Sequence, residues 1–211
     1  GVLNLAQGEF AMIGALSCIT FVNAGLPKLA AILLAVLLTA AIGFLLEKTT
    51  ITPARKSSVI TLIIITLGIS IFLKGMGLII WGSYPKTLSP MIQGDSFQFL
   101  GAVVNPQSIV VVVVLLVLLA LLYVFFDKTF IGSALKASEK NPQAANLMGI
   151  NTKTMSSIAF TLAAGLGAIA GIMIAPLTDA TYEMGFLIGV KGFVAMVPAI
   201  LILTMATTLK N

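Results

Sequence analysis

Long apolar segments that are almost free of charge recur along this chain and limit what it can fold into. Hydrophobic residues make up 59% of its 211 residues and charged residues only 9%, whereas a soluble domain has about 25% charged residues. The 12 basic and 7 acidic residues are too few to cover a water-facing surface of this size. Because a membrane-spanning helix needs about 20 mostly apolar residues, the composition provides for about six spans.

Only helices or closed barrels satisfy the backbone hydrogen bonds inside a bilayer, and barrel strands would show a short alternating pattern. The sequence therefore predicts an all-α fold, a polytopic integral membrane helix bundle of about six transmembrane helices, as a single domain over residues 1–211. The first helix could begin near Leu3, and the third could continue to Trp81. The expected spans are 10–24, 29–46, 59–73, 108–126, 155–177 and a last one from about 185 or 193 to 209.

The basic residues predict the orientation, because they concentrate in cytoplasmic loops. If successive loops alternate between sides, we expect 127–154 to be a cytoplasmic loop and 82–107 an extracytoplasmic one. Trp81 and Tyr84 would then lie at the outer interface. The predicted outer group is small: Lys28, Lys74, Lys86 and Lys191. The predicted cytoplasmic group is Lys48, Arg55, Lys56, Lys128, Lys136, Lys140, Lys153 and Lys210.

Small residues at every fourth position mark two segments as interior helices, because such stripes let helices approach closely in lipid. The alternative is that glycine and alanine are simply common in membrane helices. Segment 108–126 has bulky side chains all round and is expected to face lipid. The stripes are Ala31, Ala35, Thr39 and Gly43 in the second segment, and Ala163, Gly167, Gly171 and Ala175 in the fifth.

Three polar residues, Asn4, Gln7 and Glu9, open the first apolar segment. Polar groups inside a membrane are costly unless they face protein or water, so these residues could line a translocation path or pin a broken helix. The alternative is that Glu9 merely caps the positive end of a helix at the interface.

A short helix is predicted within the 127–154 loop. Asn141 is a favoured N-cap residue, Pro142 suits the first helical position, and Gly149 can end a helix in a left-handed turn. Residues 142–148 should therefore form two turns, with a small face at Ala144 and Ala145 that could dock into a partner's groove. The alternative is an anchor for lipid headgroups, formed by Lys136, Lys140 and Lys153.

The other polar residues favour simpler interpretations. Lys74 is expected to reach the membrane interface, Asp179 and Glu183 to lie in a solvated loop or meet an outer partner, and Cys18 to be buried. The chain lacks histidine, paired cysteines and a phosphate-binding loop, so nucleophilic catalysis and ATP hydrolysis by this chain are not expected. No metal, cofactor or nucleic-acid partner is expected either.

Several motifs jointly resemble the membrane permeases of branched-chain amino acid ABC importers, the LivH-like group. Residues 4–10 (NLAQGEF), 53–55 (PAR), 66–68 (TLG) and 160–171 are similar to segments of that family, and the similarity runs from about residue 1 to 194. The closest resemblance is to the family's ATPase-coupling loop over 132–151. Its matching positions are Gly132, Lys136, Ala137, Glu139, Asn141, Pro142, Ala144, Ala145, Gly149, Ile150 and Asn151.

This resemblance implies a non-enzymatic permease subunit that works with ABC ATPase subunits, a second permease subunit and an extracytoplasmic solute-binding protein. It would carry branched-chain or related amino acids across the bacterial inner (plasma) membrane. Permeases for urea and short amides share much of the pattern, so they remain an alternative for the small-molecule substrate. A secondary transporter independent of an ATPase, or a membrane scaffold, is a further alternative. The former would need buried charges within its spans, and only Glu9 qualifies.

The sequence also departs from the family pattern. Position 136 is lysine where arginine is more usual, and Gln143 replaces a glutamate of the general coupling pattern. Family members are longer at both ends, and the sequence from Val197 onward does not resemble their next segment. We therefore expect an incomplete or C-terminally altered permease.

Overall fold

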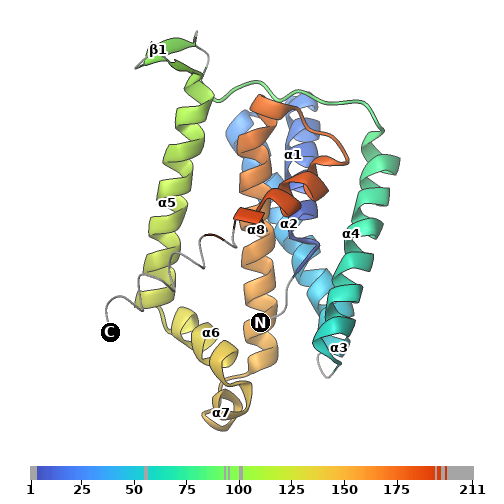
Figure 1. Ribbon diagram of the computed structural model, residues 1–211, viewed down its shortest axis with the longest axis vertical. Helices are drawn as coiled ribbons and strands as arrows, with labels where there is room; N and C mark the ends of the chain where they lie inside the picture. The colour runs from blue at the N-terminus through green and yellow to red at the C-terminus, as the bar shows by residue number, and fades with distance from the viewer. Residues whose placement is uncertain are drawn as a thin grey trace.

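In the computed structural model, the protein is a bundle of long helices. The structure describes residues 4–54, 57–92, 94, 96–99, 102–192, 194–195 and 198. Figure 1 shows the long helices running lengthwise, with the short elements at the two ends. The helices are α1 (Gln7–Asn23), α2 (Lys28–Leu46), a π-helical turn η1 (Glu47–Ile51), α3 (Thr52–Ala54), α4 (Val59–Trp81), α5 (Pro106–Lys128), α6 (Phe130–Lys140), α7 (Pro142–Leu147) and α8 (Thr152–Thr178). Residues 184–192 are also helical.

Helix α8 packs directly against α1, and glycines set the separation. A Cβ atom added to Gly171 would collide with the backbone of Ala11, and one added to Gly14 would collide with Ala168. Larger side chains at these positions would therefore force the helices apart. This close approach is what small residues provide in a membrane bundle.

Helix α2 packs against α8 through the stripe that the sequence singled out. Its buried residues are Ala31, Ala35, Thr39 and Gly43. A Cβ atom on Gly43 would collide with the side chain of Ala164.

The stripe proposed for α8 is only part of that helix's packing surface. Gly171 and Ala175 are buried, whereas Ala163 and Gly167 are partly buried. Two small residues outside the stripe, Ala164 and Ala168, are fully buried. Because α8 contacts α1 on one side and α2 on another, a single stripe cannot describe its contacts.

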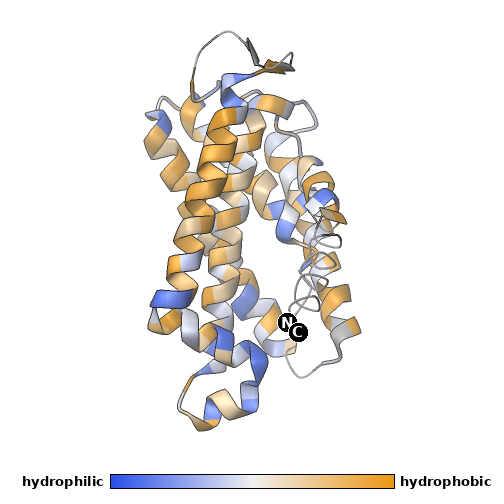
Figure 2. Cartoon of the chain, turned by 60° about the vertical axis from the view of Figure 1, so that its left-hand side comes forward, coloured by the Kyte–Doolittle hydropathy of each residue, from blue (hydrophilic) through white to orange (hydrophobic). Residues whose placement is uncertain are grey.

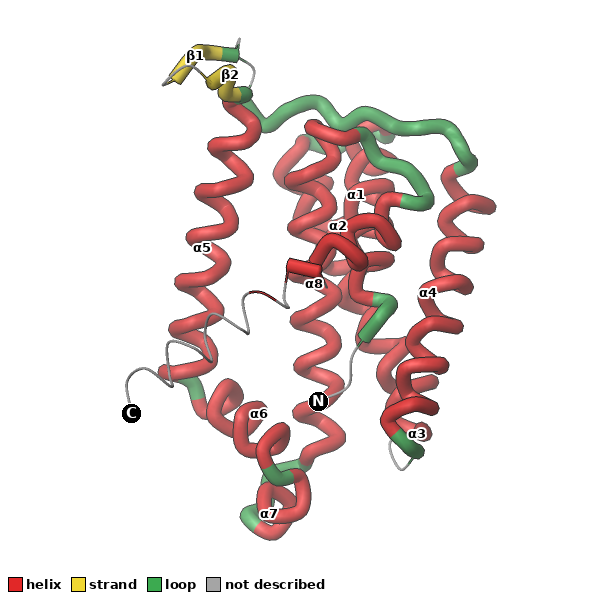
Figure 3. The backbone as a smooth tube through the Cα atoms, in the orientation of Figure 1, coloured by secondary structure: helices red, strands yellow, loops and turns green. Residues whose placement is uncertain are grey.

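Helix α5 stands apart from this group along most of its length (Figure 3). Gln107 is its one buried residue among those described, and it lies in the first turn. Valines and leucines along the rest of the helix are half exposed. Such a surface suits a helix that faces lipid, as expected from its bulky sequence.

In the described part of the chain, four helices are long and apolar enough to cross a membrane: Lys28–Ala54, Ile60–Trp81, Pro106–Lys128 and Thr152–Thr178. The expected count of about six is therefore not confirmed. The first expected span corresponds to α1, which has 17 residues and a largely buried surface. Most of the last expected span, including all of 199–209, lies outside the described residues.

The loops alternate between the two ends of the bundle. At one end, the Lys28 ammonium donates hydrogen bonds to the carbonyls of Ser89 and Pro90, and Lys86 forms an antiparallel bridge with Ala180. The other end holds η1, α3, α6 and α7. Figure 2 shows hydrophobic residues along the long helices and hydrophilic residues gathered toward the ends.

The expected loop over 82–107 contains more structure than the sequence indicated. Two short antiparallel strands, β1 (Phe97–Phe99) and β2 (Ala102–Val104), precede α5. The side chain of Gln107 connects this region to α8: its Oε1 accepts a hydrogen bond from the Met91 amide, and its Nε2 donates one to the Met173 carbonyl.

Candidate functional site

The polar residues at the start of α1 each have a different partner. The Asn4 side chain accepts a hydrogen bond from the Ala6 amide at 3.0 Å, and its carbonyl accepts one from the Gln7 amide. Gln7 Nε2 donates to the Ala163 carbonyl of α8 at 2.7 Å. Asn4 therefore stabilises the turn that leads into α1, and Gln7 joins α1 to α8.

Glu9 is buried within the bundle, with its side chain only 1% exposed. One carboxylate oxygen, Oε1, accepts a hydrogen bond from the Ser70 hydroxyl of α4 at 2.9 Å. The other, Oε2, has no hydrogen-bond partner among the described residues. It faces Gly185, where an added Cβ atom would lie 2.5 Å from it. Glu9 thus lies between α4 and the helical segment 184–192.

A second buried carboxylate, Glu47, lies between the expected spans 29–46 and 59–73. Glu47 begins η1 and is fully buried. Its Oε1 accepts a hydrogen bond from Thr52, and its Oε2 accepts one from Ser157 of α8. The only sequence signal for this site is an acidic residue at the end of an apolar segment. The serine and threonine that donate hydrogen bonds to it lie at other positions of the chain.

A charged pair lies near Glu9 along α4. Lys74 Nζ is 3.0 Å from Glu183 Oε1, and it also lies over the Tyr182 ring at 5.6 Å from the centroid. The hydrogen bond from this ammonium lowers the pKa of the Glu183 carboxyl. Sequence reasoning considered Lys74 and Glu183 separately and did not anticipate their pairing.

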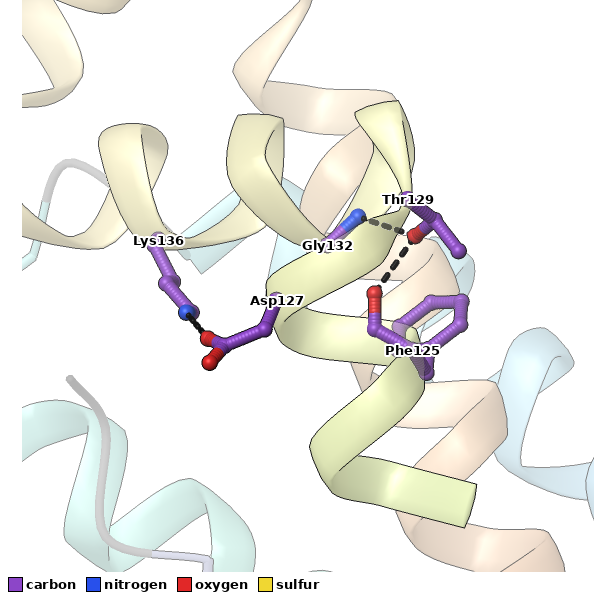
Figure 4. Close-up of polar contacts among 5 residues, drawn as sticks. All are labelled: Phe125, Asp127, Thr129, Gly132 and Lys136. Carbon is purple, nitrogen blue, oxygen red and sulfur yellow. Dashed lines mark hydrogen bonds and ion pairs between the residues drawn. The ribbon is translucent and has the colours of Figure 1, made fainter. Parts of the chain in front are cut away.

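At the opposite end of the bundle, the turn from α5 into α6 is tightly built (Figure 4). The Thr129 hydroxyl donates to the Phe125 carbonyl and accepts from the Gly132 amide. A Cβ atom on Gly132 would collide with the Phe125 backbone, so this turn requires glycine. Lys136 forms an ion pair with Asp127 across this turn.

Helix α7 begins and ends through the residues that the sequence indicated. The Asn141 side chain accepts hydrogen bonds from the amides of Gln143 and Ala144, both at 3.1 Å. Gly149 has a φ of 82°, which favours glycine. The helix spans Pro142–Leu147 and ends one residue before the expected Met148.

The exposed surface of α7 differs from the smooth alanine face that was expected. Ala144 is exposed, but Ala145 is buried against the protein. Leu147 and Met148 are 89% and 82% exposed. The apolar surface that α7 presents outward therefore includes these two large side chains.

The remaining loop residues also have defined positions. Asn151 caps α8 by accepting hydrogen bonds from the amides of Lys153 and Thr154. Asn146 of α7 accepts hydrogen bonds from the amide and hydroxyl of Thr152, the first residue of α8. Glu139 is exposed, and Ala137 and Ile150 are partly buried. Arg55, which belongs to the 53–55 motif, lies outside the described residues.

No arrangement for metal chemistry is visible in the described ranges, where no group of three or more acidic or cysteine side chains could hold an ion. Cys18 is buried, as expected. Among the described residues, the polar features of interest are the Glu9 region, the Glu47 region and the α6–α7 loop.

The profile of one family, the permease component of the branched-chain amino acid transport system, matches residues 1–208. The chain belongs to this family. The family match extends to residue 208, beyond residue 194, to which the motifs carried the resemblance. As a family member with several long apolar helices, this permease is a membrane-embedded protein.

The individual relatives are also named as permeases of branched-chain amino acid transport. The chain is 28% identical to the high-affinity branched-chain amino acid transport system permease protein BraD of Pseudomonas aeruginosa, over 93% of this chain and 69% of the relative. It is equally similar to LivH of Escherichia coli, over 93% of this chain and 68% of the relative. A probable LivH of Methanocaldococcus jannaschii is also 28% identical, over 93% and 64% of the two chains. No solved structure matches the chain significantly.

Proposed function

We propose that this permease is the membrane-spanning subunit of an ABC importer that carries branched-chain amino acids across the bacterial inner membrane. Its relatives are named as permeases for these solutes, and the family match over residues 1–208 carries the proposal. The partners would be ATPase subunits, a second permease subunit and a solute-binding protein. ATP hydrolysis would take place in the ATPase subunits, so this chain would have no enzymatic role.

Helix α7 would transmit the motion of the ATPases. Its capped ends make it a defined unit, and its exposed Leu147 and Met148 offer apolar side chains to a groove. The hydrogen bonds between Asn146 and Thr152 join α7 to the start of α8. Because α8 packs against both α1 and α2, a displacement of α7 would reach the centre of the bundle. Such an element, biased by a partner between two states, is what coupling requires.

The polar start of α1 would serve the transport path. Asn4 and Gln7 use their side chains to hold α1 in place, which favours helix pinning for these residues. Glu9 keeps one buried oxygen free of any partner among the described residues, which favours contact with solute. The predicted assignment of η1, α3, α6 and α7 to the cytoplasmic side is part of the same proposal.

Copurification tests the docking of α7. We expect Leu147→Asp combined with Met148→Asp to reduce recovery of a coexpressed ATPase subunit by at least about tenfold, because two charges would enter an apolar groove. The measurement is the ratio of ATPase to permease after affinity purification in mild detergent.

A matched control is Tyr84→Asp, which places a charge on a side chain that is 84% exposed at the opposite end. It should leave the ratio unchanged. Full recovery of the ATPase with the double variant of α7 would show that this helix is not the docking element.

A further inference from the structure

Polar side chains recur at every fourth position on one face of α4. Thr66, Ser70 and Lys74 interrupt a helix that is otherwise composed almost entirely of apolar residues and glycine. Residues four apart lie on the same face, about 6 Å apart along the axis. Polar groups within membrane helices are costly and commonly mark a solute or ion path.

Two carboxylates from other elements meet this face at successive levels. Glu9 accepts a hydrogen bond from Ser70, and Glu183 pairs with Lys74 one helical turn farther along. The Lys74 and Glu183 side chains are 35% and 52% exposed, whereas Glu9 is 1% exposed. An accessible pair of opposite charges therefore lies next to a buried carboxylate with one oxygen that no described residue bonds.

We propose, on the basis of the function proposed above, that these groups form a binding site for zwitterionic amino acids. Lys74 holds the solute carboxylate, and Glu183 holds its ammonium group at the accessible level. Glu9 then receives the ammonium group one turn deeper, through the oxygen that Ser70 does not occupy.

The exchange of partners makes this site suitable for binding and release. An exposed ion pair contributes little to stability, so a solute can open it at small cost. The carboxylate of a zwitterionic solute replaces Glu183 beside Lys74, and its ammonium group replaces Lys74 beside Glu183. Both new contacts are charge-assisted hydrogen bonds, which are stronger than hydrogen bonds between neutral groups. Urea and short amides have no charged groups for this exchange, so the site selects amino acids over them.

Apolar side chains around the charged groups suit the hydrocarbon part of such a solute. Met12 is fully buried beside Gly77 of α4, and Tyr182 lies against both Gly77 and Lys74. Met184, which follows Glu183 in the chain, is also buried.

Leucine uptake by the complete transporter in proteoliposomes, with its binding protein and ATPases, tests the site. We expect Lys74→Met and Glu183→Gln each to lower uptake by about tenfold, since each removes one charged contact. Each residue holds a different group of the solute, and the exposed ion pair between them contributes little, so the losses should multiply in the double variant. Lys74→Arg, which retains the charge, should stay close to the wild type.

The double variant separates binding from a merely structural ion pair. If the pair only stabilises the protein, removing both charges is no worse than removing one, and that result would overturn the site. Lys86→Met controls for loss of a lysine at the same end of the bundle and should have little effect. Absence of leucine uptake by the wild-type assembly would instead overturn the proposed function and the site with it.

Discussion

At the scale of single residues, three side-chain hydrogen bonds of this permease join residues that lie far apart in the chain. Ser70 and Glu9 are 61 positions apart, Lys74 and Glu183 are 109 apart, and Ser157 and Glu47 are 110 apart. Sequence reasoning could select Glu9 because a carboxylate in an apolar segment is costly. It could not find these partners, because serine and lysine at a helix position do not reveal which element will pack against them.

Removal of the Glu47 carboxylate should destabilise the protein. In Glu47→Ala, the Thr52 hydroxyl loses its acceptor, and the Ser157 hydroxyl keeps only its longer hydrogen bond to the Lys153 carbonyl. Loss of a hydrogen-bond partner at a buried position costs about 1–3 kcal/mol. We expect a lower midpoint of thermal unfolding for the purified protein in detergent.

The exposed Glu139 provides the comparison for Glu47. Glu139→Ala removes the same group from the surface and should unfold at the wild-type temperature. Equal unfolding temperatures for the two variants would show that the Glu47 hydrogen bonds do not stabilise the fold.

At the scale of helices, the apolar pattern predicts the elements well and their contacts less well. The expected span 108–126 lies inside α5 (Pro106–Lys128), and the short helix begins at Pro142 as expected. Both ends of this helix could be predicted from the sequence, because Asn141, Pro142 and Gly149 affect only the backbone of neighbouring residues. The burial of Ala145 was not readable, because it depends on how α7 packs against the rest of the protein.

The contact between α1 and α8 should not tolerate a large side chain. Gly171→Leu would place its side chain in the backbone of Ala11, and overpacking of this kind costs about 1–3 kcal/mol or more. We expect a marked loss of folded, monodisperse protein in size-exclusion chromatography.

Gly68→Leu is the matched change on α4. An added Cβ atom at Gly68 has no neighbouring atom within 4 Å, so this variant should elute as the wild type does. Wild-type behaviour of Gly171→Leu would contradict the close helix contact described above.

At the scale of the whole molecule, the shortage of charge predicted a membrane bundle, and the family match agrees with it. The number of spans was harder to predict. Helix α1 is short and largely buried within the protein, whereas hydropathy treats each apolar segment as if it met lipid alone. The solute also cannot be read from composition, since its proposed contacts come from α1, α4 and the segment that follows α8.

Uptake of radiolabelled solutes into proteoliposomes tests the central claim most directly. The assembly would contain this permease, its partner permease, the ATPases and the binding protein, with ATP on the side of the ATPases. We expect uptake of leucine that requires ATP and the binding protein, with little uptake of urea. Transport of leucine without ATP, or transport of urea in place of leucine, would contradict the assignment as an importer of branched-chain amino acids.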